Sequence, residues 1–193
     1  MRNYEAIEEH IIGLLKDNLP QNLYYHGVHH TYDVLSAALL IAKEEKITEH
    51  ELFLLKVAIL YHDAGFTSAY QNHEEASCAL AKKDLPLFEL NPEETGIICG
   101  MIMATKIPQK PHTLLEKIIA DADLEYLGTD SFQRIGDTLF EEAKIYLNVK
   151  TRRQWDEIQA NFLRKHHYFT GFCISHREGI KQKHLMELEK RLA

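Results

Sequence analysis

The sequence lacks the features of a secreted or membrane-spanning protein. Its three cysteines, Cys78, Cys99 and Cys173, are odd in number and far apart, which predicts buried free thiols instead of a disulfide framework or a zinc cluster. No run approaches the roughly 18 consecutive apolar residues of a transmembrane helix, and the N-terminus has no apolar stretch of a signal peptide. We therefore expect a cytoplasmic protein with no membrane partner.

Basic charge is scarce as well. The formal net charge of −7 at pH 7 disfavours binding to the phosphate backbone of a nucleic acid. Internal repeats, low-complexity segments and alternating strand patterns are also missing. In contrast, 45% of the 193 residues are hydrophobic, enough for the core of one domain.

Helical periodicity covers most of the chain. Thr48 and Glu51 have the spacing of a capping box, Asn72 and Glu75 have a similar spacing, and Asn91-Pro92 is a strong helix start. The expected helices cover approximately residues 4–19, 31–45, 48–61, 73–83, 92–105, 111–123, 129–147, 151–165 and 175–192. The prediction is an all-α domain of about eight or nine helices around one core.

One charged pair stands out against this apolar background. The run Ile59-Leu60-Tyr61 ends in His62-Asp63, and Ala64-Gly65 follows. Burial of an ionisable pair is costly unless another group compensates it, and a divalent cation is an obvious candidate. The histidine content is high, at 12 residues, so other histidines could complete such a site.

Two other segments supply such side chains. Residues 25–31 contain His26, His29 and His30, and residues 118–128 contain Asp121 and Asp123. The two aspartates are two residues apart and so point to nearly opposite sides of a regular helix, which prevents both from binding one ion. Imidazoles with carboxylates suit Mn, Fe, Co, Ni or Mg better than a structural zinc.

The local motifs resemble those of the HD-domain metal-dependent phosphohydrolase superfamily, and of a small bacterial subgroup of predicted HD phosphohydrolases. Four blocks occur in the right order: Tyr25-His26-x3-His30-Thr31, His62-Asp63-Ala64-Gly65-Phe66, His73-Glu74-x-x-Ser77, and Ala104-Thr105-Lys106 followed by Asp121-Ala122-Asp123-Leu124. The resemblance covers roughly residues 22–128. It implies a single HD-type domain over 1–193, in which residues 129–193 pack against the core or form a lid.

The resemblance also implies the ligands of a divalent metal ion. Carried over by position, they are His30, His62, Asp63 and Asp123. The Tyr-His-x3-His spacing favours His30 over His29, and the Ala-Asp-Leu context favours Asp123, with Asp121 as the alternative. Metal identity among Mn, Fe, Co, Ni and Mg stays open.

The activity implied is hydrolysis of a nucleotide or another small phosphoester by a metal-activated water. Asp63 would orient or deprotonate the water, His26 or His73 would protonate the leaving oxygen, and Glu74 would position a water or a substrate hydroxyl. For substrate binding, we expect Lys106, as a point charge on a phosphate, and Thr105.

Two other functions remain open at this stage. Some HD proteins are di-iron oxygenases that use additional histidines, and here His112 is the one further histidine between His73 and Asp123. A non-catalytic nucleotide-binding HD module is the other alternative, although the four proposed ligands are all present. The sequence also leaves a homodimer open.

Overall fold

The chain folds into helices, and the residues that the computed structural model describes, 3–193, contain no strand. The α-helices are α1 (Tyr4–Asn18), α2 (Val28–Glu45), α3 (Glu49–Tyr61), α4 (His73–Asp84), α5 (Pro92–Ala104), α6 (Leu114–Asp123), α7 (Phe132–Tyr146), α8 (Arg152–Lys165), α9 (Gly171–His176) and α10 (Glu178–Leu192). Short 3₁₀ helices are η1 (Ala64–Thr67), η2 (Leu85–Phe88) and η3 (Glu125–Gly128). The predicted all-α class is confirmed, and the described residues hold ten α-helices, one more than the upper expectation.

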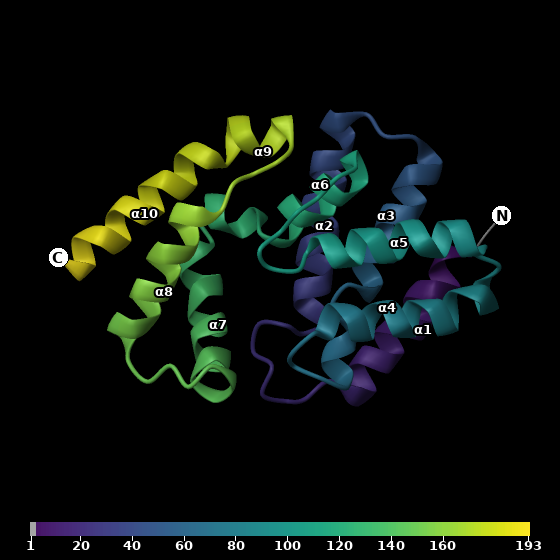
Figure 1. Cartoon of the computed structure of the whole chain (residues 1–193), viewed down its shortest axis with the longest axis horizontal. Helices are drawn as coiled ribbons and strands as arrows, with labels where there is room; N and C mark the ends of the chain where they lie inside the picture. The colour runs from purple at the N-terminus through teal and green to yellow at the C-terminus, as the bar shows by residue number, and fades with distance from the viewer. Residues whose placement is uncertain (1–2) are drawn as a thin grey trace.

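The helices form two groups that meet near α6 (Figure 1). Side chains of α1 to α6 build the largest hydrophobic core, where Ile7, Ile41, Leu55 and Ile118 are fully buried. Leu127 of η3 contributes to a second, smaller cluster together with side chains of α7, α8 and α10. The candidate metal ligands lie on the elements of the first group, next to the second.

Helix α3 shows how the sequence places a charged pair beside this core. Thr48 and Glu51 form the predicted capping box, with Thr48 Oγ1 accepting from the Glu51 N–H at 3.2 Å and Glu51 Oε2 accepting from the Thr48 N–H at 2.8 Å. From Leu54 onward, most side chains of the helix are buried. The buried helix therefore positions His62 and Asp63 at its C-terminal end, beside the core.

The starts of α2 and α6 and the cap of α4 differ from the sequence expectation. Helix α2 begins at Val28, before residue 31, so that the adjacent histidines lie in its first turn. Helix α6 begins at Leu114 because the Thr113 side chain caps it, three residues after the expected start at 111. Helix α4 begins where expected, but Asn72 adopts a left-handed backbone conformation (φ 56°) and its side chain does not cap the helix; it accepts a hydrogen bond from Lys106 Nζ instead.

The predicted helix over 175–192 is α10 for most of its length, and its first two residues belong to a separate short helix, α9. The six-residue α9 starts where the Thr170 side chain accepts from the Cys173 N–H, and it ends before Arg177. Helix α10 then begins at Glu178 and packs against α8. The interruption explains why the number of helices exceeds the prediction.

The expected state of the cysteines is confirmed, since Cys78, Cys99 and Cys173 are buried and free. Within residues 3–193, the apolar stretches of the helices are too short for any of them to cross a membrane.

Candidate metal centre

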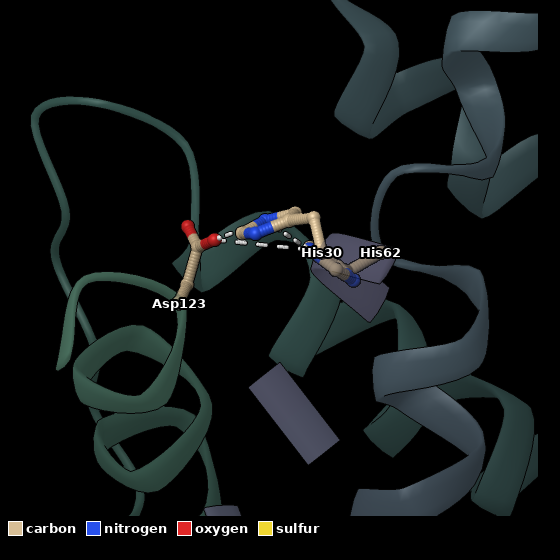
Figure 2. Close-up of side chains that lie close together, drawn as sticks. All are labelled: His30, His62 and Asp123. Atoms are coloured by element: carbon tan, nitrogen blue, oxygen red, sulfur yellow. Dashed lines mark hydrogen bonds and ion pairs between the residues drawn. The ribbon is translucent and has the colours of Figure 1, made fainter. Parts of the chain in front are cut away.

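Four side chains predicted as metal ligands converge at the junction of α2, α3 and α6. His30 lies in the first turn of α2, His62 caps the end of α3, and Asp123 is the last residue of α6. His30 Nε2 is 3.1 Å from Asp123 Oδ1 and 3.4 Å from His62 Nε2, and His62 Nε2 is 3.7 Å from Asp123 Oδ1. Figure 2 shows Asp123 pointing from the end of α6 toward both imidazoles. These three residues form a group that could hold a metal ion.

Asp63 adds a fourth side chain to the group. Its Oδ2 atom lies 3.4 Å from His30 Nε2 and 3.3 Å from His62 Nε2. This oxygen is buried and has no hydrogen bond in the described part of the protein. A buried carboxylate oxygen that has ion-pair contacts but no hydrogen bond is poorly compensated, so its position favours a site that is completed by a cation.

The distances in the group suit a shared ion. Ligand atoms about 2.1 Å from one ion, at angles of about 90° to 109°, lie roughly 3.0 to 3.4 Å from each other. His62 Nδ1 donates to the Ile59 carbonyl at 2.7 Å, which leaves Nε2 as the nitrogen directed at the group. The four residues present therefore fit a divalent cation.

Electrostatics in the group also favour positive charge. Burial alone would lower the pKa of His62, but the Asp63 and Asp123 carboxylates raise it to about 9. Burial opposes the ionisation of Asp63, whereas the neighbouring His62 and His73 imidazoles hold its pKa well below the usual range. The group therefore attracts a proton when no ion is bound, and a cation would compete with that proton.

The structure distinguishes between the alternative metal ligands at neighbouring sequence positions. The side chain of His29 is exposed, whereas His30 is buried in the group. Asp121 is fully buried on the other side of α6, where Oδ2 accepts from the Thr170 N–H at 2.8 Å and from Thr170 Oγ1 at 2.6 Å. Asp121 therefore fixes the loop before α9, and Asp123 is the aspartate that faces the histidines.

The turn after His62 is held in place by Ser77 of α4. Ser77 Oγ donates to the His62 carbonyl at 2.7 Å and accepts from the Gly65 N–H at 2.8 Å. A Cβ atom on Gly65 would lie 2.0 Å from the His73 carbonyl oxygen, so only glycine permits this approach of η1 to α4. These contacts give a physical reason for the glycine of the second motif and the serine of the third.

His26 is positioned by a residue that the sequence did not suggest. Its Nδ1 atom is 2.7 Å from Glu142 Oε1, and the backbone N–H groups of Tyr25 and His26 both donate to Glu142 Oε2. Burial opposes ionisation of Glu142, but the hydrogen bond and charge of His26 lower its pKa. With Nδ1 bonded to Glu142, His26 has Nε2 available for another partner.

His73 and Glu74 lie on the opposite side of Asp63 from the two buried histidines. His73 Nε2 is 3.4 Å from Asp63 Oδ1 and 3.6 Å from Glu74 Oε1. Burial lowers the pKa of His73, but the bond and charge of Asp63 outweigh it and raise the pKa. The Phe66 ring stacks on His73 with centroids 3.9 Å apart, which fixes the plane of the imidazole.

The two residues expected to bind substrate are placed differently. Thr105 faces a cavity beside the group, although its hydroxyl donates to the Ile102 carbonyl at 2.8 Å. Lys106 Nζ forms an ion pair with Glu75 and donates to Asn72 Oδ1 at 3.2 Å. The structure therefore brings Thr105 to the site but holds the Lys106 ammonium outside it.

The cavity beside the group has a volume of about 250 Å³. Its polar lining includes His26, Asp63, His73, Glu74 and Asp123, and most of its apolar lining comes from η3, α7 and α8. A small molecule in this cavity would contact both the proposed ligands and the proposed acid-base residues.

Glu142 is the residue of this site that sequence reasoning missed. It lies in α7, outside the segment 22–128 that carries the motifs, and is buried on the same helix as Phe132, Gly136 and Ala143. A carboxylate next to the apolar face of an amphipathic helix was the available signal, because such a group requires a partner.

Comparison with known proteins identifies the fold. No family model and no curated protein matches the sequence. One similar crystal structure is that of a predicted HD superfamily hydrolase from an uncultured Thermotogales bacterium. The two sequences are 21% identical, the match covers 81% of this chain and 91% of that chain, and the TM-score is 0.56. A second similar crystal structure is that of a protein from Lactobacillus plantarum. The two sequences are 16% identical, the match covers 99% of this chain and 98% of that chain, and the TM-score is 0.67. The chain therefore has the fold of a predicted HD superfamily hydrolase, in agreement with the resemblance of its motifs.

Proposed function

We propose that the protein is a metal-dependent phosphohydrolase that cleaves a small phosphoester with water. The observation that carries the proposal is the buried convergence of His30, His62, Asp63 and Asp123 at the wall of a cavity, with one Asp63 oxygen lacking a hydrogen bond. The shared fold with a predicted hydrolase supports it. These four residues would hold the ion, whose identity among Mn, Fe, Co, Ni and Mg the donor types leave open.

When bound, the ion would polarise a phosphoryl oxygen and lower the pKa of a nearby water to about 7. The residues of the chain would perform the remaining tasks. Asp63 Oδ1, on the side of His73, orients the attacking water and accepts a hydrogen bond from it. His26 and His73 both line the cavity, and either imidazole can donate the proton that the leaving oxygen needs. Glu74 orients His73 or a substrate hydroxyl.

The test is hydrolysis of p-nitrophenyl phosphate and bis-p-nitrophenyl phosphate after addition of Mn, Co, Ni or Mg. Asp63→Asn keeps the shape of the side chain but removes a charge at the site, so we expect a fall in kcat/KM of more than about 100-fold. Asp130→Asn is the matched control, because Asp130 is exposed. Equal activity of Asp63→Asn and wild type, or no hydrolysis with any of the four metals, would contradict the proposal.

A further inference from the structure

The cavity at the candidate metal centre continues along an apolar wall. Leu127 of η3, Phe132 and Leu139 of α7, and Trp155 and Phe162 of α8 all line it. Leu127, Phe132 and Phe162 belong to the second hydrophobic cluster, and Trp155 and Leu139 to a third one. A group that extends from the ligands toward α7 and α8 therefore enters apolar surroundings.

Among the described residues, lysine and arginine are missing from the lining of this cavity, and its basic side chains are the imidazoles of His26 and His73. The nearby Lys106 is paired with Glu75. Asp63, Glu74 and Asp123 instead contribute carboxylates to the lining. A chain of two or three phosphates needs several cationic or N–H donors, so this lining suits a molecule with a single phosphate.

Few polar groups are available far from the ligands. In the part of the lining formed by η3, α7 and α8, the polar side chains are Tyr126 and Gln159, and the indole N–H of Trp155 is buried without a hydrogen bond within the described residues. Nucleobase recognition requires several hydrogen-bonding groups along the base edge. An apolar organic group instead gains from burial against this wall.

We propose that the substrate is an ester of a single phosphate with an apolar alkyl or aryl group. This inference rests on the proposed function. The phosphate lies at His30, His62, Asp63 and Asp123, and the organic group lies between η3, α7 and α8. A water-sized group occupies roughly 30 Å³, and the cavity volume of about 250 Å³ thus accommodates roughly eight non-hydrogen atoms, that is, the phosphate group and an organic group of about three or four carbon atoms.

The reaction then needs no further reactant. Water adds its oxygen to phosphorus, the bond from phosphorus to the ester oxygen breaks, and the leaving oxygen takes a proton. The products are an apolar alcohol and inorganic phosphate. This differs from the nucleotide that the sequence alone favoured.

A series of n-alkyl monophosphates from ethyl to octyl, compared with adenosine monophosphate, tests the inference on the Mn-loaded protein. We expect kcat/KM to rise about two- to fourfold per added methylene, up to a length of about four carbon atoms, and the butyl ester to exceed adenosine monophosphate. Equal kcat/KM for the ethyl and butyl esters, or a preference for the nucleotide, would overturn it.

A filled cavity provides a second test. Ile158 lines the cavity from α8 and is 42% exposed, so the larger side chain of Ile158→Trp can be accommodated while part of the apolar volume is occupied. We expect this variant to lose most of the dependence on chain length. Ile174→Trp is the control, because Ile174 of α9 is 53% exposed and lies outside the cavity. An unchanged chain-length dependence in Ile158→Trp would count against the inference.

Binding of alkylphosphonates, which cannot be hydrolysed at the carbon–phosphorus bond, separates this inference from the proposed function. Calorimetric affinity that increases from ethyl- to butylphosphonate supports the apolar site, even if no ester is hydrolysed and the proposed function fails. The contrasting result is hydrolysis of the esters at rates that do not depend on chain length, together with the same affinity for phosphonates at every chain length. That result would support the proposed function and refute the apolar substrate.

Discussion

At the scale of single residues, Asp63 connects the two halves of the site. One of its carboxylate oxygens faces His30 and His62, and the other lies 3.4 Å from His73 Nε2. The residue can therefore take part in ion binding and in proton transfer at the same time. Its position depends on Ser77, which bonds the backbone on either side of it.

Glu142 is expected to act as a positioning residue through His26. Glu142→Gln keeps the size of the side chain but weakens its bonds to three N–H groups. We expect a stability loss of about 1–3 kcal/mol and a kcat lowered about 10-fold, with little change in Mn affinity. Chemical denaturation, phosphoester kinetics and metal titration measure the three quantities.

The adjacent Glu141→Gln is the matched control for this prediction, since Glu141 is exposed and pairs with Lys144 on the surface. It should change stability by less than about 0.5 kcal/mol. If Glu142→Gln behaved like Glu141→Gln, the proposed support of His26 would be wrong.

The sequence predicted the group around His62 because its residues fall within short motifs. His30, His62, Asp63 and Asp123 lie close together as the resemblance implied. Glu142 could not be found this way, because its contact with His26 spans 116 residues and no local pattern encodes such a distance. The position of the Lys106 ammonium could not be predicted either, because its partner Glu75 lies 31 residues away in the sequence.

At the scale of elements, the close packing of η1 on α4 sets the geometry after His62. Gly65→Ala would place a Cβ atom 2.0 Å from the His73 carbonyl oxygen and 2.8 Å from the Ser77 nitrogen. Since both are backbone atoms, the two elements must separate, and we expect a loss of about 3 kcal/mol or more in the free energy of unfolding. Urea denaturation measures it.

Gly13→Ala serves as the comparison, because no atom lies within 4 Å of a Cβ at this position of α1. Alanine in a helix interior should stabilise the protein by about 0.5–1 kcal/mol. A Gly65→Ala protein as stable as wild type would show that η1 and α4 are not tightly coupled.

The contact between α8 and α10 predicts a dependence of stability on pH. Burial and the charge of Lys181 lower the pKa of His166 from 6.5 to about 3. Between these values, the unfolded chain binds a proton that the folded chain does not. The contribution of His166 is therefore complete above pH 6.5 and is lost as the pH falls toward 3.

From pH 7 to pH 5, wild type should thus lose about 2 kcal/mol more stability than His166→Gln, which has no imidazole to protonate. Urea denaturation at the two pH values measures the difference. His167→Gln, at the exposed neighbouring position, should retain the wild-type behaviour. Parallel pH profiles for His166→Gln and wild type would contradict the prediction.

Helix starts with a complete capping signal were predictable, and those decided by long-range contacts were not. The Thr48–Glu51 capping box forms as the sequence indicated. Helix α5 starts at Pro92 as expected, and the structure adds a capping box between Asn91 and Glu94. Asn72 departs from its expected capping role because Lys106, distant in the sequence, occupies its side-chain oxygen. Helix α9 was missed because six residues are too few for a helical period to be recognised.

At the scale of the whole molecule, the cavity exists because two groups of helices meet at α6. Its polar lining belongs to the N-terminal helices and the 3₁₀ turn after α3, whereas its apolar lining comes from η3, α7 and α8. Sequence reasoning left residues 129–193 as packing helices or a lid. The apolar wall could not be predicted because it combines side chains that are separated along the chain and joined only by the fold.

The most direct test of the account is a calorimetric titration of metal-free protein with Mn²⁺, comparing His30→Ala with His29→Ala. The two histidines are adjacent, but only His30 is buried in the group. The account predicts that wild type and His29→Ala bind at least about one ion per chain with similar affinity, and that His30→Ala binds at least about 100-fold more weakly. Equal affinities for the two variants, or no binding by wild type, would contradict it.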